Sequence, residues 1–95
     1  MRPTDNILGI DVNGVVRSLD ATDKAKAVQG VFIYRFNSPL TYFNASYFKR
    51  RLLEQYARQK DDTQCVIIDA VPCFTHLDLS VMAMLADLDD IFKKR

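Results

Sequence analysis

The distribution of apolar and polar positions predicts a strand, a helix, a second strand and a second helix, in that order along the chain. Residues 31–36 are β-branched or aromatic on both faces, with the exception of Arg35. This pattern is typical of a strand that is covered on both sides. Apolar residues recur at helical spacing from Ala45, and Asn44 is the expected N-cap, because its side chain can accept from the first free helix amides. The unbroken apolar run 65–68 predicts a central parallel strand. Together these elements predict a right-handed βαβ unit.

The pattern is less regular before residue 30 and between the first strand and the first helix. Residues 7–10 and 15–16 predict two short strands, joined by a hairpin turn at the Asn-Gly pair 13–14. Residues 19–28 carry charge and alanine and predict either a helical turn or an ordered connection. Residues 40–43 predict one more short strand before the helix.

The last helix, expected from about Asp78 to Lys93, is apolar on two sides. The first stripe, which would cover the sheet, consists of Val81, Met84, Leu85, Leu88 and Phe92. The second stripe consists of Leu79, Met82, Ala83 and Ala86. Either this helix is buried all round, or the second stripe is covered by another protomer, another domain or a further part of the same domain. We expect this stripe and one sheet edge to be uncovered, and the chain to self-associate by exchange of elements between copies.

Composition narrows the class of protein. With 95 residues the chain is one small domain, and its net charge of +1, from 13 basic and 12 acidic side chains, argues against a nucleic-acid partner. It contains no apolar window of the length that crosses a membrane. Cys65 and Cys73 match no metal-binding spacing, and no Gly-rich phosphate loop or catalytic set is visible. We therefore expect no enzyme and no metal site.

The junction before the last helix carries the candidate chemistry. Asp78 is the expected cap of this helix, and Ser80 follows two residues later. A phosphate on Ser80 would lie near free helix amides and the positive end of the helix dipole. The alternative is that Ser80 serves only local hydrogen bonding in the first turn.

Three segments of the chain resemble the STAS domains of bacterial SulP-type sulfate and anion permeases. Residues 30–36, GVFIYRF, are similar to the family strand G-hydrophobic-x-hydrophobic-x-R. Residues 39–48, PLTYFNASYF, are similar to P-L-x-F-x-N-A-x-x-F, which is the most specific of the three. The third segment runs from Ile68-Asp69 to residues 78–82, DLSVM.

The resemblance implies an α/β fold of α+β character, with a mixed β-sheet and helices packed on one side. Residues 1–95 would be a single STAS domain, in which residues 1–6 are a linker from a preceding membrane domain and the last strand and helix of the family fold are absent. The implied role is a non-catalytic, regulatory interaction domain of a secondary active anion transporter, without a cofactor unless a nucleotide binds. It would lie at the cytoplasmic face of the inner membrane as part of an integral membrane protein.

The resemblance also implies the partners. These are the membrane transporter domain of the same polypeptide, other cytoplasmic proteins and a second copy of the chain, with no nucleic acid. The alternative is a free-standing phospho-switch like the related anti-sigma-factor antagonists, whose D-S-S-G motif is phosphorylated on serine. Asp78 and Ser80 match the aspartate and that serine, whereas Leu79 and Val81 replace the other serine and the glycine.

Overall fold

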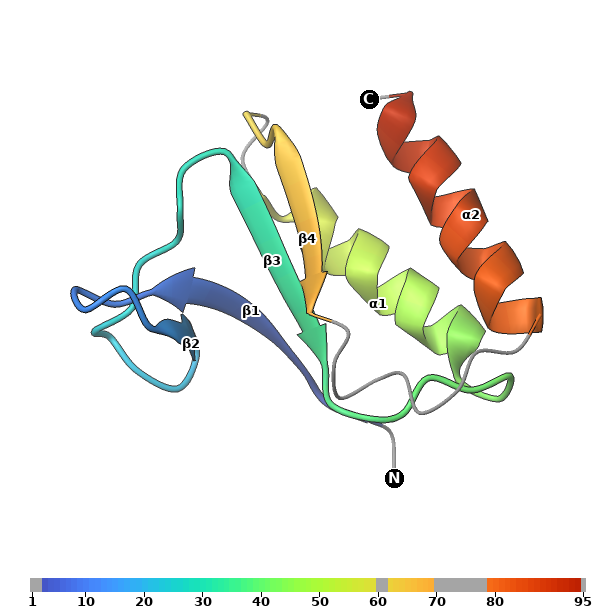
Figure 1. The fold of residues 1–95 in the computed structure, drawn as a ribbon, viewed down its shortest axis with the longest axis horizontal. Helices are drawn as coiled ribbons and strands as arrows, with labels where there is room; N and C mark the ends of the chain where they lie inside the picture. Colours follow the sequence, from blue (N-terminus) through green and yellow to red (C-terminus); the bar gives the residue numbers. More distant parts are fainter. Residues whose placement is uncertain (1–2, 60–61, 70–78, 95) are drawn as a thin grey trace.

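A computed structural model of the chain describes residues 3–59, 62–69 and 79–94. In chain order the elements are β1 (Asp5–Ile10), β2 (Val16–Ser18), β3 (Val31–Phe36), α1 (Ala45–Ala57), β4 (Cys65–Asp69) and α2 (Leu79–Lys93). The described strands form one mixed sheet in the order β2-β1-β3-β4, with β1 antiparallel to both neighbours and β3 parallel to β4. Both helices pack on the same side of this sheet (Figure 1), which confirms the predicted fold class and the βαβ unit β3-α1-β4.

The core lies between β3 and the two helices. Phe32, Tyr34 and Phe36 alternate along β3 and are at most 1% exposed, because they all point at the helix layer. Phe48 of α1 lies between two of them, with ring centroids 5.7 Å from Tyr34 and 5.2 Å from Phe36. Burying such rings supplies the largest share of apolar area in a domain of this size. These contacts fix α1 on the sheet.

The prediction that β3 is covered on both sides agrees with its burial, since no β3 residue is exposed and Ile33 on the far face is buried. In the described residues the helices lie on one side, and the far side carries Leu8, Ile33 and Ile67 next to one another on β1, β3 and β4. Leu8 and Ile33 are buried, whereas Ile67 at the margin is 45% exposed. β4 is accordingly an edge strand among the described strands and not the central strand that its apolar run predicted.

Residues 40–43 form no strand; they lead through a turn into α1. Only Leu40 is buried there, and the aromatic residues that suggested a strand point outward. Asn44 occupies the N-cap position but does not cap α1 with its side chain. Its amide instead accepts from the Thr41 N–H at 2.8 Å and donates to the Pro39 carbonyl at 2.9 Å, so it closes the preceding loop.

The N-terminal part is more ordered than the sequence predicted. β1 begins at Asp5, so residues 5 and 6, which were expected in a linker, belong to the sheet. That a membrane domain precedes them stays a prediction. The hairpin between β1 and β2 is confirmed, with Gly14 at φ +77° in its turn. Residues 19–28 form no helix; they are an ordered connection held by a bridge between Ile10 and Lys26.

We predict that Gly9→Ala lowers the free energy of unfolding by about 1–3 kcal/mol, because a Cβ at Gly9 would lie 2.5 Å from the Lys26 carbonyl oxygen and 2.6 Å from Leu19 Cδ2. Urea unfolding followed by far-UV circular dichroism measures the change. Gly14→Ala is the matched control: nothing lies within 4 Å of its Cβ, so only backbone strain at positive φ, about 1 kcal/mol, should appear. A larger loss for Gly14→Ala would contradict the prediction.

Candidate functional site

Ser80 lies in the first turn of α2 and is exposed. Its neighbour Val81 is fully buried among the core residues, and this fixes the rotation of the helix so that Ser80 points to solvent. Asp78 lies outside the described residues, so its role as cap of α2 and its position beside Ser80 stay predictions. The structure therefore gives the site one accessible hydroxyl near a helix N-terminus.

The second apolar stripe of α2 lies on the surface. Leu79 is 82% exposed and Met82 is 51% exposed, and both alanines of the stripe, Ala83 and Ala86, are exposed as well. The opposite side of α2 is buried through Val81, Met84 and Leu88. Large apolar side chains left in water in this way are typical of a surface that binds another surface.

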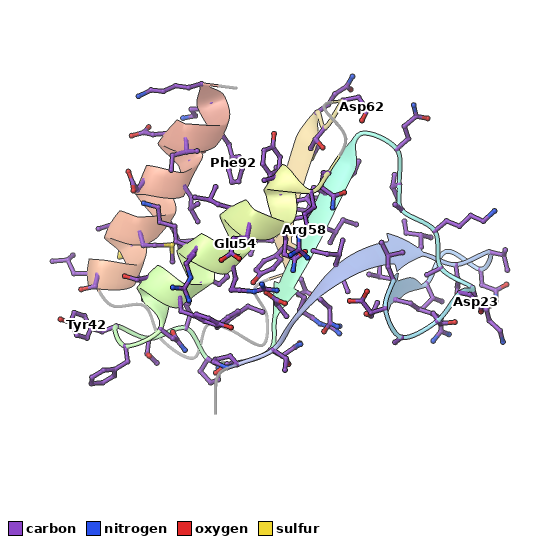
Figure 2. The ribbon with its side chains drawn as sticks, turned by 180° about the vertical axis from the view of Figure 1, so that it is seen from behind. Asp23, Tyr42, Glu54, Arg58, Asp62 and Phe92 are labelled. Carbon is purple, nitrogen blue, oxygen red and sulfur yellow. The ribbon has the colours of Figure 1, made fainter. Side chains whose placement is uncertain are left out.

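Two aromatic residues that the sequence analysis placed in a strand are exposed on the loop that leads into α1. Tyr42 is 67% exposed and Phe43 is 93% exposed, and their rings meet edge to face with centroids 5.5 Å apart. Figure 2 shows Tyr42 at the end of the molecule where α1 and α2 start. We call Tyr42, Phe43, Leu79 and Met82 the apolar corner. Pro39 and Asn44 could have indicated that residues 40–43 form a loop and not a strand, since proline and asparagine are common turn residues.

A hollow of about 730 Å³ lies between the two helices. Its lining residues come from both helices and are Ser46, Lys49, Arg50, Leu53, Ala83, Met84 and Asp87. Lys49 and Asp87 form an ion pair across it, and this pair ties α1 to α2 at the surface. Arg50 lies over the Tyr47 ring, 5.3 Å from its centroid, and keeps a positive charge on the exposed side of α1.

A partly buried polar cluster holds β1, β3 and α1 together. Arg51 donates to both carboxylate oxygens of Asp5, at 2.8 and 3.0 Å, and the Tyr34 hydroxyl donates to Asp5 at 2.7 Å. We call this the Asp5 clamp. Sequence reasoning missed it because Asp5 and Arg51 are 46 positions apart, and no spacing rule connects them.

The clamp shifts the ionisation of its members. Burial alone would raise the pKa of Asp5, but the hydrogen bonds from Arg51 and Tyr34 and the charge of Arg51 outweigh it, so this pKa lies below its usual value. Burial, followed by the hydrogen bond to Asp5, raises the pKa of Tyr34 above its usual value. The hydrogen bonds to Asp5 likewise raise the pKa of Arg51. The three groups thus remain carboxylate, phenol and guanidinium at neutral pH.

Within residues 3–59, 62–69 and 79–94, no three His, Cys, Asp or Glu side chains gather where they could hold a metal ion. Cys65 is a free thiol on β4, while Cys73 and His76 lie outside the described residues. None of the described helices has the length and hydropathy needed to cross a membrane. The candidate site exposes the Ser80 hydroxyl, the apolar side chains of Leu79 and Met82, and the rings of Tyr42 and Phe43.

A family model for the STAS domain matches residues 24–95, which include β3, α1, β4 and α2. The chain belongs to the STAS domain family. Two curated proteins of Mycobacterium tuberculosis, from two strains and each named "Probable sulfate transporter", are 33% identical to it over 70 residues. The match spans 72% of this chain and 12% of each relative, so the chain corresponds to a small part of their length.

A solved structure supports the same fold. The murine Solute Carrier 26 family member A9 anion transporter, in its inward-facing state, matches 99% of this STAS chain and 15% of its own chain, with a TM-score of 0.88 and 19% identity. At that identity the likeness shows the fold alone. It extends over β1 and β2, which the family model does not reach. The resemblance to STAS domains, and the mixed sheet with two helices, are therefore confirmed.

We predict that Asp5→Asn lowers the free energy of unfolding at pH 7 by about 1–3 kcal/mol, because Arg51 and Tyr34 would lose their charged acceptor. The pKa of Asp5 is lower in the folded state, so its contribution is present above the unfolded value of about 3.9 and is lost as the pH falls through the folded value. The difference between Asp5→Asn and the wild type should therefore shrink between about pH 5 and pH 3. Urea unfolding at pH 7, 5, 4 and 3 measures it.

Glu54→Gln serves as the control for the clamp. Glu54 lies 3.5 Å from Arg50 and 3.8 Å from Arg51, and its side chain is 46% exposed, so its loss should change stability by less than about 0.5 kcal/mol. Equal losses for Asp5→Asn at pH 3 and pH 7 would show that the clamp does not act through the ionised carboxylate.

Proposed function

We propose that this STAS domain is a cytoplasmic regulatory and interaction domain of a SulP-type anion transporter. The observation that carries the proposal is family membership together with curated relatives named sulfate transporters, of which this chain matches 12% of the length. A domain that is a small fraction of a transporter and carries no membrane-crossing helix in its described part suits a role in control. The ion that the whole protein carries is, on this proposal, sulfate or a related anion.

The domain acts by contact. Its accessible candidate docking surface is the apolar corner, because exposed apolar and aromatic side chains are suited to docking on a protein surface. The clamp and the aromatic core hold the two layers rigidly, so the corner is presented in one orientation. Its partners are the membrane domain of the same polypeptide and other cytoplasmic proteins, and binding there changes the transport rate without catalysis by this domain.

A second candidate function is a phospho-switch through Ser80, as in anti-sigma-factor antagonists. The exposure of Ser80 in the first turn of α2 favours it, because a kinase can reach the hydroxyl and the helix N-terminus tolerates negative charge. Val81 speaks against it, because a fully buried valine stands where those proteins have glycine and leaves the backbone less accessible. We therefore place the transporter role first.

We predict that Leu79→Ser with Met82→Ser, made in the complete reading frame, lowers sulfate uptake by roughly fivefold, the effect of about 1 kcal/mol of lost docking energy. Uptake of labelled sulfate by cells, corrected for the amount of transporter in the membrane, measures it. Val12→Ser is the control, because Val12 is 97% exposed on the β1–β2 hairpin and outside the apolar corner. Unchanged uptake in both variants, or a reading frame without membrane segments, would contradict the proposed function.

Ser80→Ala and Ser80→Asp distinguish the two functions. On the transporter proposal both variants fold and support equal uptake, because Ser80 is exposed and makes no contribution through a phosphate. On the phospho-switch proposal Ser80→Asp would change partner binding and Ser80→Ala would remove a kinase-dependent mass increase. Intact mass spectrometry of the protein isolated from its own cells, with pull-down of its partners by each variant, decides between them.

A further inference from the structure

The loop before α1 holds two aromatic rings in water. Tyr42 is 67% exposed and Phe43 is 93% exposed, and their ring centroids are 5.5 Å apart. The loop itself is fixed, because Leu40 is buried in the core and the Asn44 side chain closes the loop with two hydrogen bonds to its backbone. Rings that a fixed loop holds away from the core leave water only when another surface covers them.

Hydrogen-bond donors follow these rings along α1. Ser46, Lys49 and Arg50 are three and four positions apart, so they share one side of the helix, and all three line the hollow of about 730 Å³ between α1 and α2. A hydroxyl, an ammonium and a guanidinium are side-chain groups that bind phosphate. Leu53 and Met84 line the same hollow, so phosphate donors and hydrocarbon lie next to each other there.

The beginning of α1 is the positive end of this face. Neither α1 nor α2 carries an acidic side chain in its first turn, and the Asn44 side chain does not cap the α1 amides, so the positive end of the α1 dipole stays uncapped by it. The acids of the face lie beyond the second turn of their helices, where Asp87 pairs with Lys49 and Glu54 lies 3.5 Å from Arg50. The rings therefore stand at the end of the face that attracts anions.

We propose that this aromatic-basic face, which consists of Tyr42, Phe43, Ser46, Lys49 and Arg50, docks on the head-group layer of a bilayer that contains anionic phospholipid. Aromatic side chains partition into the head-group layer, and lysine and arginine are attracted to anionic lipid at the same surface. A bilayer presents phosphate above hydrocarbon everywhere, which matches donors that stand behind protruding rings. The inference goes beyond the proposed function and does not need it, because the protein contact proposed above is tested through other residues of the apolar corner.

The first test places a fluorescent reporter at the rings. The sequence contains no tryptophan, so a single introduced tryptophan reports its own surroundings. The emission of Phe43→Trp should shift to shorter wavelength when vesicles of phosphatidylcholine with about one-third phosphatidylglycerol are added, because the indole enters the head-group layer. Val12→Trp is the matched control, since Val12 is 97% exposed on the β1–β2 hairpin, and its emission should not change. No shift for Phe43→Trp, or equal shifts for both variants, would overturn the proposal.

The second test changes the charge of the face in both directions. On the same vesicles Arg50→Gln should weaken binding about fivefold and Glu54→Gln should strengthen it by about the same factor, because each charge near an anionic surface acts with its own sign. On vesicles of pure phosphatidylcholine both variants should bind as the wild type does. Sedimentation with sucrose-loaded vesicles measures the bound fraction. Opposite signs exclude a loss of structure as the cause, so a change of the same sign in both variants would overturn the proposal.

The alternative occupant of this face is a protein. If the wild-type chain bound neither kind of vesicle while Phe43→Ser in the complete reading frame lowered sulfate uptake, the face would belong to a protein contact and the proposal would be overturned. Vesicle binding concerns the aromatic-basic face alone. A negative result there leaves the transporter role untouched, because that role is tested through Leu79 and Met82.

Discussion

The packing of β3 against α1 is the constraint on which the rest of the domain depends. Three aromatic rings leave β3 on one side, and two of them, Tyr34 and Phe36, contact Phe48, so α1 has a single position on the sheet. α2 contacts α1 far more than it contacts any strand, and its rotation follows from that contact. The exposure of Ser80 and of the apolar corner is thus a consequence of how the aromatic core fills, since Val81 can be buried in only one orientation of α2.

The sequence was informative where periodicity and burial agree. The run 31–36 and the helical spacing after Ala45 located β3 and α1, and the Asn-Gly turn located the first hairpin. Local propensity misled at residues 40–43, where β-forming aromatic residues lie in a turn closed by Asn44. The apolar run 65–68 also led to a central position for β4, whereas none of its residues is buried and β4 lies at the edge of the described strands. An apolar run indicates apolar faces but does not show how many strands pair with it.

Part of the candidate site could be predicted from the sequence and part could not. The two-sided apolar character of α2 was readable from spacing, because residues three and four apart share a helix face. The aromatic half of the apolar corner was not, since exposure of Tyr42 and Phe43 depends on the loop that Asn44 closes. The Asp5 clamp was beyond reach for another reason: its partners meet only after β1 has paired with β3 and α1 has packed. Contacts of that kind need the assembled fold.

The Asp5 clamp has a mechanical consequence. Tension applied to the backbone at Thr4 would not stay in β1, because the Thr4 carbonyl is bonded to the Asn37 N–H after β3 and the next residue is gripped by a side chain of α1. β1 and α1 would therefore be displaced together. A displacement of Thr4 would therefore be transmitted to α1, whereas a flexible linker at this position would not transmit it.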